Sequence, residues 1–217
     1  MTNRGFGRPR SGSSRRRGPL RPLKRTVLIV CEGKETEPNY FNGLKREEPI
    51  REEFAIRVKR GKGGSRLQVA QFAVDRKNEP GTDYDEVWCV MDGERPEGLD
   101  ETRRALDLLD GNSISAAVSN PAFEVWFLAH FERTAAAFLD PDAVIVRLNK
   151  HWQERFSIRY DKADDRIYDR VAKLTASAVG NARWVREKHH DPAACIVDCN
   201  SATDVYRLVA RLHPAAG

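Results

Sequence analysis

The stretch TVLIVCEGKETEPNYF, residues 26–41, decides the fold. Its first part, 27–31, is continuously apolar and rich in β-branched side chains, a pattern typical of a strand buried on both faces of a parallel sheet. Gly33 lets the chain turn sharply, and Thr36–Pro38 supplies an N-cap threonine, an acid for the helix dipole and a first-turn proline, which predicts a helix. We therefore expect Glu32 at the carboxyl end of a strand, where open α/β sheets place their ligands.

A second strand of the same character is predicted at Asp85–Met91, and it ends in the acidic sequence Asp92-Gly93-Glu94. Because the carboxyl ends of parallel strands meet at one edge of a sheet, Glu32, Asp92 and Glu94 are expected to lie close together. Carboxylates gathered in this way raise each other's pKa and persist most easily around a hard cation such as Mg²⁺ or Mn²⁺. These three residues are therefore the predicted metal ligands and catalytic carboxylates of a site for metal-assisted phosphoryl chemistry. Simple N-caps or solvated loop acids are the alternative.

A glycine-rich basic loop, KRGKGGS at residues 59–65, follows a predicted strand at Phe54–Val58 and precedes a predicted helix. Backbone N–H groups of such a loop, flanked by lysine and arginine, form a natural phosphate cradle. The spacing differs from that of a Walker A loop, so we assign the loop to substrate phosphate rather than to ATP. A flexible basic connection without a ligand is the alternative. The predicted substrate-binding residues of the loop are Arg60, Lys62, Gly63 and Ser65.

The next strand, predicted at Ile114–Val118, delivers further polar side chains to the same edge. Asn120 is expected to cap a helix that begins at Pro121 and is assigned to substrate binding. Glu124 lies in the first turn of that helix and is expected near the metal site, as a catalytic residue that acts either as a further ligand or as a general base. A carboxylate that only complements the helix dipole is the alternative. His130 follows the helical spacing of its aromatic neighbours and is expected in the core.

The remaining elements complete an α/β pattern, which predicts a Rossmann-like parallel sheet flanked by helices, with a helical insertion before the last strand. We expect helices at 99–110, 141–152, 163–188 and 202–212, and a last strand at 194–198. Cys195 and Cys199 would share one face of that strand, so buried thiols are favoured over a zinc site.

The composition separates a basic tail from the body of the chain. A chain of 217 residues with 40% hydrophobic residues can form one α/β domain, which we place at residues 26–213. Residues 1–25 contain eight arginines, one lysine and no acid, which predicts a disordered tail that contacts nucleic-acid phosphate or merely improves solubility. Without these nine cations, 28 basic residues face 32 acidic residues, so the net charge of +5 is a property of the tail.

Two further features bear on the cellular compartment. The sequence contains no apolar stretch that approaches the length of a membrane span, so no membrane association is expected. Four scattered cysteines without a signal peptide indicate the reducing cytoplasm.

Three blocks of sequence, taken in order, resemble a known family. They are Cys31-Glu32-Gly33 with Thr36-Glu37-Pro38 and Tyr40-Phe41, then Asp92-Gly93-Glu94, then Ser119–Trp126 with His130-Phe131. A Glu-Gly after one strand and an acidic pair after a later one resemble the TOPRIM domain of topoisomerases, primases and overcoming-lysogenization-defect nucleases. The finer pattern, over about residues 26–212, is closer to the RloB-like family. At Glu94 the sequence departs from the TOPRIM pattern, in which this position is usually Asp.

The resemblance implies a TOPRIM fold and a metal-dependent nuclease of a prokaryotic antiphage, or abortive-infection, system. Glu32 would act as general base or acid, and Asp92 with Glu94 would hold Mg²⁺ or Mn²⁺. An ABC-type ATPase partner is also implied, since RloB-like proteins look like the TOPRIM half of such a pair and this sequence has no ATPase motifs. Tyr160-Asp161-Lys162 resembles a Tyr-x-Lys element of the family, which makes Lys162 a candidate for neutralising phosphate charge. A surface lysine is the alternative.

Two other functions are weighed against the nuclease. A non-catalytic nucleic-acid- or protein-binding subunit would keep the fold and use the basic tail for affinity. DNA strand passage or priming would need large accessory domains, for which this chain is too short. The choice among DNA, RNA and tRNA, and the formation of a homo-oligomer, are left open.

Overall fold

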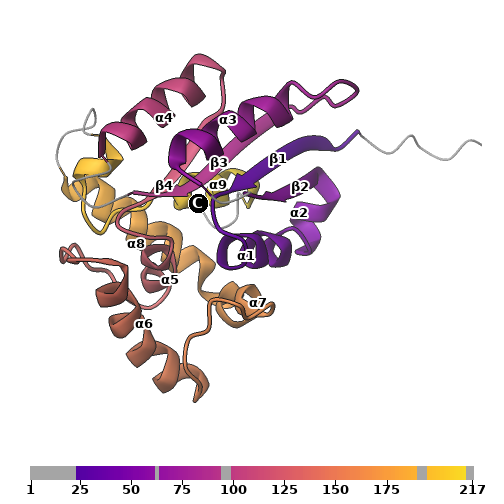
Figure 1. Ribbon diagram of the computed structural model, residues 1–217. Coiled ribbons are helices and arrows are strands. Elements are labelled where there is room, and N and C mark those ends of the chain that lie inside the picture. The colour runs from indigo at the N-terminus through magenta and orange to yellow at the C-terminus, as the bar shows by residue number, and fades with distance from the viewer. Residues whose placement is uncertain (1–22, 62–63, 94–98, 190–194, 214–217) are drawn as a thin grey trace, which may run out of the picture.

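The computed structural model describes residues 23–61, 64–93, 99–189 and 195–213. These residues form an α/β fold in which a parallel sheet has helices on both faces, as Figure 1 shows. The predicted fold class is therefore confirmed. Within the described residues the sheet has four strands in the order β2-β1-β3-β4. They are β1 (Arg25–Cys31), β2 (Phe54–Arg60), β3 (Glu86–Asp92) and β4 (Ser115–Ser119).

The central strand β1 is buried on both faces because its side chains alternate between two hydrophobic cores. Ile29 packs in the core that contains residues of α1 (Thr36–Leu44). Leu28 packs in the core that contains residues of α3 (Arg66–Lys77) and α4 (Leu99–Gly111). In Figure 1, α3 and α4 lie above the sheet and α1 lies below it. The continuous apolar run of the sequence predicts this arrangement, since both faces of the strand need apolar side chains.

The helices that follow β4 lie where a helical insertion was predicted, but within the described residues no further strand of the sheet follows them. The first long one, α6 (Pro141–Phe156), is capped by Asp140, whose Oδ1 accepts the N–H of Ala143 at 2.9 Å. The prediction of helix throughout 163–188 is wrong in detail, because this segment is not helical before Ile167 and a 3₁₀ turn at 172–174 separates two helices. At this break the hydroxyl of Thr175 donates to the carbonyl of Ala172 at 2.8 Å. The other helices are α2 (Glu48–Glu53), α5 (Glu124–Ala129), α7 (Ile167–Val171), η2 (Ala172–Leu174), α8 (Thr175–Lys188) and α9 (Val205–Leu212).

The predicted last strand at 194–198 is wrong for the described part of that segment. Ile196–Asp198 form the 3₁₀-helix η3, and residue 194 lies outside the described residues. The carbonyl of Val197 is bonded by the side-chain amide of Asn120 at 2.7 Å instead of by a neighbouring strand. Among the described residues, the edge of β4 is met by one antiparallel bridge, between Ser119 and Thr203.

The helix predicted to begin at Pro121 begins three residues later, at Glu124. Asn120 does not cap it, because the amide of Asn120 is bonded to the 196–197 carbonyls and its backbone N–H donates to the carbonyl of Ala202. Asn120 therefore joins the end of β4 to the segment around η3. The predicted closing helix is present as α9, which starts at Val205 rather than at 202.

Two compositional expectations can be compared with the structure. Within the described ranges, no helix combines the length and the apolar character that a membrane span requires. All four cysteines lie in these ranges, and all four are free thiols.

Candidate active site

A pocket of about 500 Å³ opens at the carboxyl ends of β1 and β3. This is the edge at which open α/β sheets bind their ligands. Four of the carboxylates that line it come from four places in the fold: the ends of β1 and β3, and the first turns of α1 and α5. The described lining residues are Glu32, Gly33, Lys34, Glu35, Thr36, Glu37, Asp92, Phe123, Glu124 and Lys162.

Glu32 follows β1 directly, and its side chain reaches across to β3. Its Oε2 accepts the backbone N–H of Asp92 at 3.0 Å. Its Oε1 lies 3.7 Å from an Nη of Arg66. Glu32 and Asp92 are therefore in contact although they are 60 residues apart, as expected for residues at the ends of neighbouring parallel strands.

Asp92 ends β3 and lies in the most acidic part of the pocket. Its Oδ1 accepts the backbone N–H of Phe123 at 2.8 Å. Loss of hydration raises the pKa of Asp92 well above its ordinary value, and the charges of Glu37, Glu32 and Glu124 raise it further. The Phe123 N–H acts in the opposite direction. The ionised form of Asp92 is thus disfavoured unless a positive charge is brought to it.

Glu37 belongs to the same cluster, although sequence reasoning assigned it only to the helix dipole. It lies in the first turn of α1, is 5% exposed, and accepts the backbone N–H of Gly33 at 2.9 Å. Burial is the main cause of its raised pKa, and the charges of Glu124 and Glu32 add to the effect. The signal in the sequence was the spacing, since an acid four residues after Gly33 can fold back onto the turn.

Glu124 is 2% exposed and is bonded by two groups from the loop after α6. The ammonium of Lys162 lies 3.1 Å from its Oε1, and the Tyr160 hydroxyl donates to the same oxygen at 3.0 Å. The hydroxyl of Thr36 donates to the carbonyl of Lys162 at 3.4 Å, which ties this loop to the start of α1. The Tyr-x-Lys element therefore contributes to the pocket through Lys162, whose side chain remains 54% exposed.

Arg66 is a further residue of the site that the sequence did not reveal. It is the first residue of α3 and is 8% exposed. Its Nε donates to the backbone carbonyl of Asp92 at 3.0 Å, and its Nη lies close to Glu32. The guanidinium therefore fixes the ends of β1 and β3 relative to each other. No local pattern predicted this, because both contacts are distant in sequence.

A family model described as RloB-like protein matches residues 27–212. The chain belongs to the RloB-like family. The matched segment contains every pocket residue described above. Neither the search of curated proteins nor the search of solved structures found a match to this RloB-like chain.

The predicted substrate-binding residues of the RloB-like chain fall into different places. Arg60 ends β2 in register with Cys31 and is not among the described residues that line the pocket. Ser65 precedes α3 in a capping box, where its N–H donates to the side chain of Gln68 at 3.0 Å. Asn120 is buried against the η3 segment and is not among the described residues that line the pocket. Lys62, Gly63 and the predicted metal ligand Glu94 lie outside the described residues.

The donor set of the RloB-like chain fits a hard divalent cation in its chemistry, because the acids around Asp92 offer only oxygen ligands and repel one another. No three His, Cys, Asp or Glu side chains in the described ranges already form a ligand cluster. Mg²⁺ usually keeps several waters and takes one or two carboxylates together with substrate phosphate. Glu32 and Asp92 are the pair in contact that would hold such an ion.

Proposed function

We propose that this protein is a metal-dependent nuclease that hydrolyses phosphodiester bonds in DNA or RNA, tRNA included. The observation that supports this proposal is the convergence of Glu32, Glu37, Asp92 and Glu124 on one pocket that also contains Lys162. Carboxylates and a lysine at a sheet edge suit metal-assisted phosphoryl chemistry, in which a cation stabilises charge on the phosphate while another group moves a proton.

The carboxylates of the pocket have distinct roles in this proposal. Glu32 and Asp92 would bind Mg²⁺ or Mn²⁺, which supplies charge stabilisation at the phosphate and a more acidic water when bound. Glu32 would in addition accept a proton from the attacking water. Glu37 has a raised pKa and lies in the same pocket, so it is a second candidate for holding a proton.

Lys162 would act on the phosphate itself. The side chain of Lys162 is 54% exposed while its partner Glu124 is buried. The ammonium could therefore contact a phosphate oxygen in the pocket while it stays close to the Glu124 carboxylate. A cation held at the place where negative charge develops stabilises the transition state. This assigns Lys162 the role that the family resemblance implies.

The proposal extends to a partner and a cellular role that rest on the resemblance alone. RloB-like proteins look like one half of a pair with an ABC-type ATPase, in prokaryotic antiphage defence, and we propose the same here. A non-catalytic subunit that binds nucleic acid through the basic residues 1–25 is the competing function.

A cleavage assay separates the two functions. The full chain, alone and with the proposed ABC-type ATPase partner, is incubated with end-labelled DNA and RNA in Mg²⁺ or Mn²⁺. Glu32→Gln and Asp92→Asn should each reduce turnover at least a hundredfold, and the double variant should be hardly worse, because the groups act as a unit. Glu154→Gln, an exposed acid on α6, is the matched control. Undiminished cleavage by a folded Glu32→Gln protein would count against the nuclease.

A further inference from the structure

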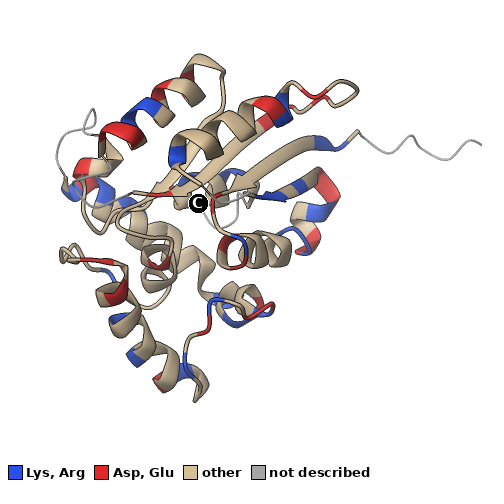
Figure 2. Cartoon of the chain, viewed as in Figure 1, with Lys and Arg blue, Asp and Glu red and all other residues tan. Residues whose placement is uncertain are grey.

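The outer edge of β2 carries cations that the proposed chemistry does not use. β2 is an edge strand that pairs only with β1 among the described strands. Its sequence, FAIRVKR, contains three cations and no acid, and Arg57, Lys59 and Arg60 are all exposed. Figure 2 shows β2 marked in blue, whereas the neighbouring α2 carries both colours.

Two of these cations lie on one face of the strand. Side chains alternate along a strand, and Ile56 and Val58 pack against the core beneath α1. Arg57 and Lys59 therefore lie on the opposite face, the one that α3 partly covers. Two residues along a strand are about 7 Å apart, a spacing that successive phosphates of an extended nucleic-acid chain can match.

Arg57 is held beside an aromatic ring. Its Nη1 donates to the hydroxyl of Tyr84 at 3.4 Å, and its guanidinium carbon lies 5.9 Å from the centre of the ring. Both residues line a depression of about 460 Å³ at the edge of the sheet. Arg57 is the cation among the described residues that line this depression. A cation next to a partly exposed aromatic ring is a combination that binds the backbone and bases of single-stranded nucleic acid.

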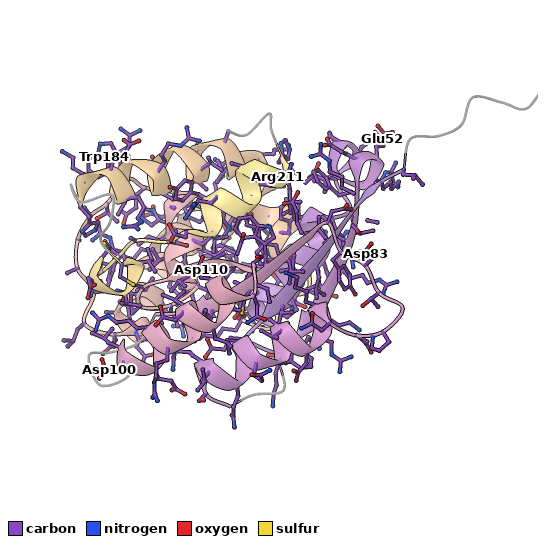
Figure 3. All side chains as sticks on the ribbon, turned by 90° about the horizontal axis from the view of Figure 1, so that it is seen from above. Glu52, Asp83, Asp100, Asp110, Trp184 and Arg211 are labelled. Atoms are coloured by element: carbon purple, nitrogen blue, oxygen red, sulfur yellow. The ribbon has the colours of Figure 1, made fainter. Side chains whose placement is uncertain are left out.

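The positive charge lies toward the carboxylate pocket. Arg60 is in register with Cys31. The next residue, Gly61, packs against the backbone of Glu32, so that a Cβ added to Gly61 would lie 2.6 Å from the carbonyl oxygen of Glu32. Acids also lie near the start of the strands, and one of them, Asp83, lines the same depression as Arg57. Figure 3 shows Glu52 and Asp83 at the end of the molecule where β1 begins.

We propose that the edge of β2 binds an extended single strand of nucleic acid and leads it into the pocket. The inference rests on the proposed nuclease function and names its substrate class. Glu37 and Glu124, which line the pocket, are only 5% and 2% exposed, and a single strand can bring a phosphate closer to such recessed side chains than a duplex can. The acid-free, cationic strand fits a polyanion and opposes the addition of a neutral peptide strand.

Binding by the full chain with Glu32→Gln tests the inference without cleavage. Fluorescence anisotropy is measured with a labelled single-stranded oligonucleotide and with a duplex of the same length, over a series of KCl concentrations. Arg57→Ala with Lys59→Ala should weaken single-strand binding at least tenfold and reduce the salt slope by about 1.4, or about 0.7 for each lost phosphate contact. Lys150→Ala with Arg155→Ala removes two exposed cations from α6 and should change neither quantity appreciably.

The outcomes separate the two proposals. The proposal that the edge of β2 binds a single strand would be overturned by either of two results. One is an equal loss of single-strand affinity for both pairs of substitutions, and the other is an equal loss of affinity for duplex and single strand. Binding that depends on Arg57 and Lys59 while the wild-type protein cleaves nothing would overturn only the nuclease. Thermal melting compares the two pairs first, and Arg57→Gln with Lys59→Gln replaces the alanine pair if the latter does not fold.

Discussion

Lys162 places its ammonium nitrogen 3.1 Å from Oε1 of Glu124, and this carboxylate is 2% exposed. A buried carboxylate that loses its cation is costly, whereas loss of both charges is tolerated. We expect Lys162→Met to lower the free energy of unfolding by about 1–2 kcal/mol, less than for a fully buried pair because Lys162 is 54% exposed. Adding Glu124→Gln should restore most of this loss in urea denaturation.

The matched control for this pair is Lys173→Met, which removes an exposed lysine from η2. It should change stability by less than about 0.5 kcal/mol. If the Lys162→Met protein and the double variant were equally destabilised, Lys162 would not be the group that stabilises the buried charge of Glu124.

The raised pKa values of Asp92 and Glu37 make cation binding depend on pH. The folded protein keeps these protons to higher pH than the unfolded chain, so ionisation of the pair reduces stability as pH rises above the ordinary carboxyl range. A bound divalent cation offsets the repulsion. Mg²⁺ should therefore raise Tm by about 3 °C at pH 7.5 and by much less at pH 5.

Differential scanning fluorimetry checks this effect in the presence and absence of Mg²⁺. Asp92→Asn should raise Tm without metal at pH 7.5 and remove the shift that Mg²⁺ produces. Glu154→Gln should leave the shift intact. An unchanged Mg²⁺ shift in the Asp92→Asn protein would place the cation elsewhere.

His130 makes the folded protein sensitive to acid. It is 2% exposed, its Nδ1 hydrogen bonds to the carbonyl of Trp126 at 2.9 Å, and burial lowers its pKa to about 4. The folded state favours the neutral ring. The contribution of His130 to the free energy of unfolding is therefore complete above about pH 6.5 and is lost as the pH falls toward 4. The loss should reach about 3 kcal/mol.

Urea denaturation of wild type and His130→Gln across this pH interval measures that contribution. The stability difference between the two proteins should shrink as the pH falls. His213→Gln, at the end of α9, is the control. Its stability should change with pH in parallel with that of the wild type. Parallel curves for His130→Gln as well would show that His130 is not the acid-sensitive group.

Gly61 and Gly180 should respond to alanine in opposite directions. A Cβ at Gly61 would lie 2.6 and 2.7 Å from the backbone oxygens of Glu32 and Cys31, so the end of β1 must shift. We expect a loss of about 2 kcal/mol together with weaker Mg²⁺ binding. An added Cβ at Gly180 in α8 would meet no atom within 4 Å beyond the neighbouring backbone of its own helix, and alanine there should stabilise by about 0.5–1 kcal/mol. Denaturation curves that agree for the two variants would contradict this account.

The sheet and the contact between Glu32 and Asp92 could be predicted because a strand buried on both faces leaves a continuous apolar run, and parallel strands bring their ends together. Arg66 and Glu37 could not be assigned in the same way. The contacts of Arg66 depend on how α3 docks, and the bond between Glu37 and Gly33 depends on the geometry of one turn.

The incorrect strand at 194–198 has a different cause. Ile196 and Val197 are both buried, and a short apolar run of this kind suits a strand and a single helical turn equally well. Tertiary contacts favour the helical turn over the strand, chiefly the hydrogen bond from the side-chain amide of Asn120 to the carbonyl of Val197.

The contacts of Asn120 also set an order of events during translation. Its backbone N–H and C=O bond to Ala202 and Ser201, and the N–H of Asp204 bonds to the carbonyl of Val118. A ribosome makes β1, β3 and β4 well before these partners, so a nascent chain lacks the clamp that fixes the wall bearing Glu124. The wall of the pocket that bears Glu124 would then be fixed only late in synthesis, after residues 201–204 have been made.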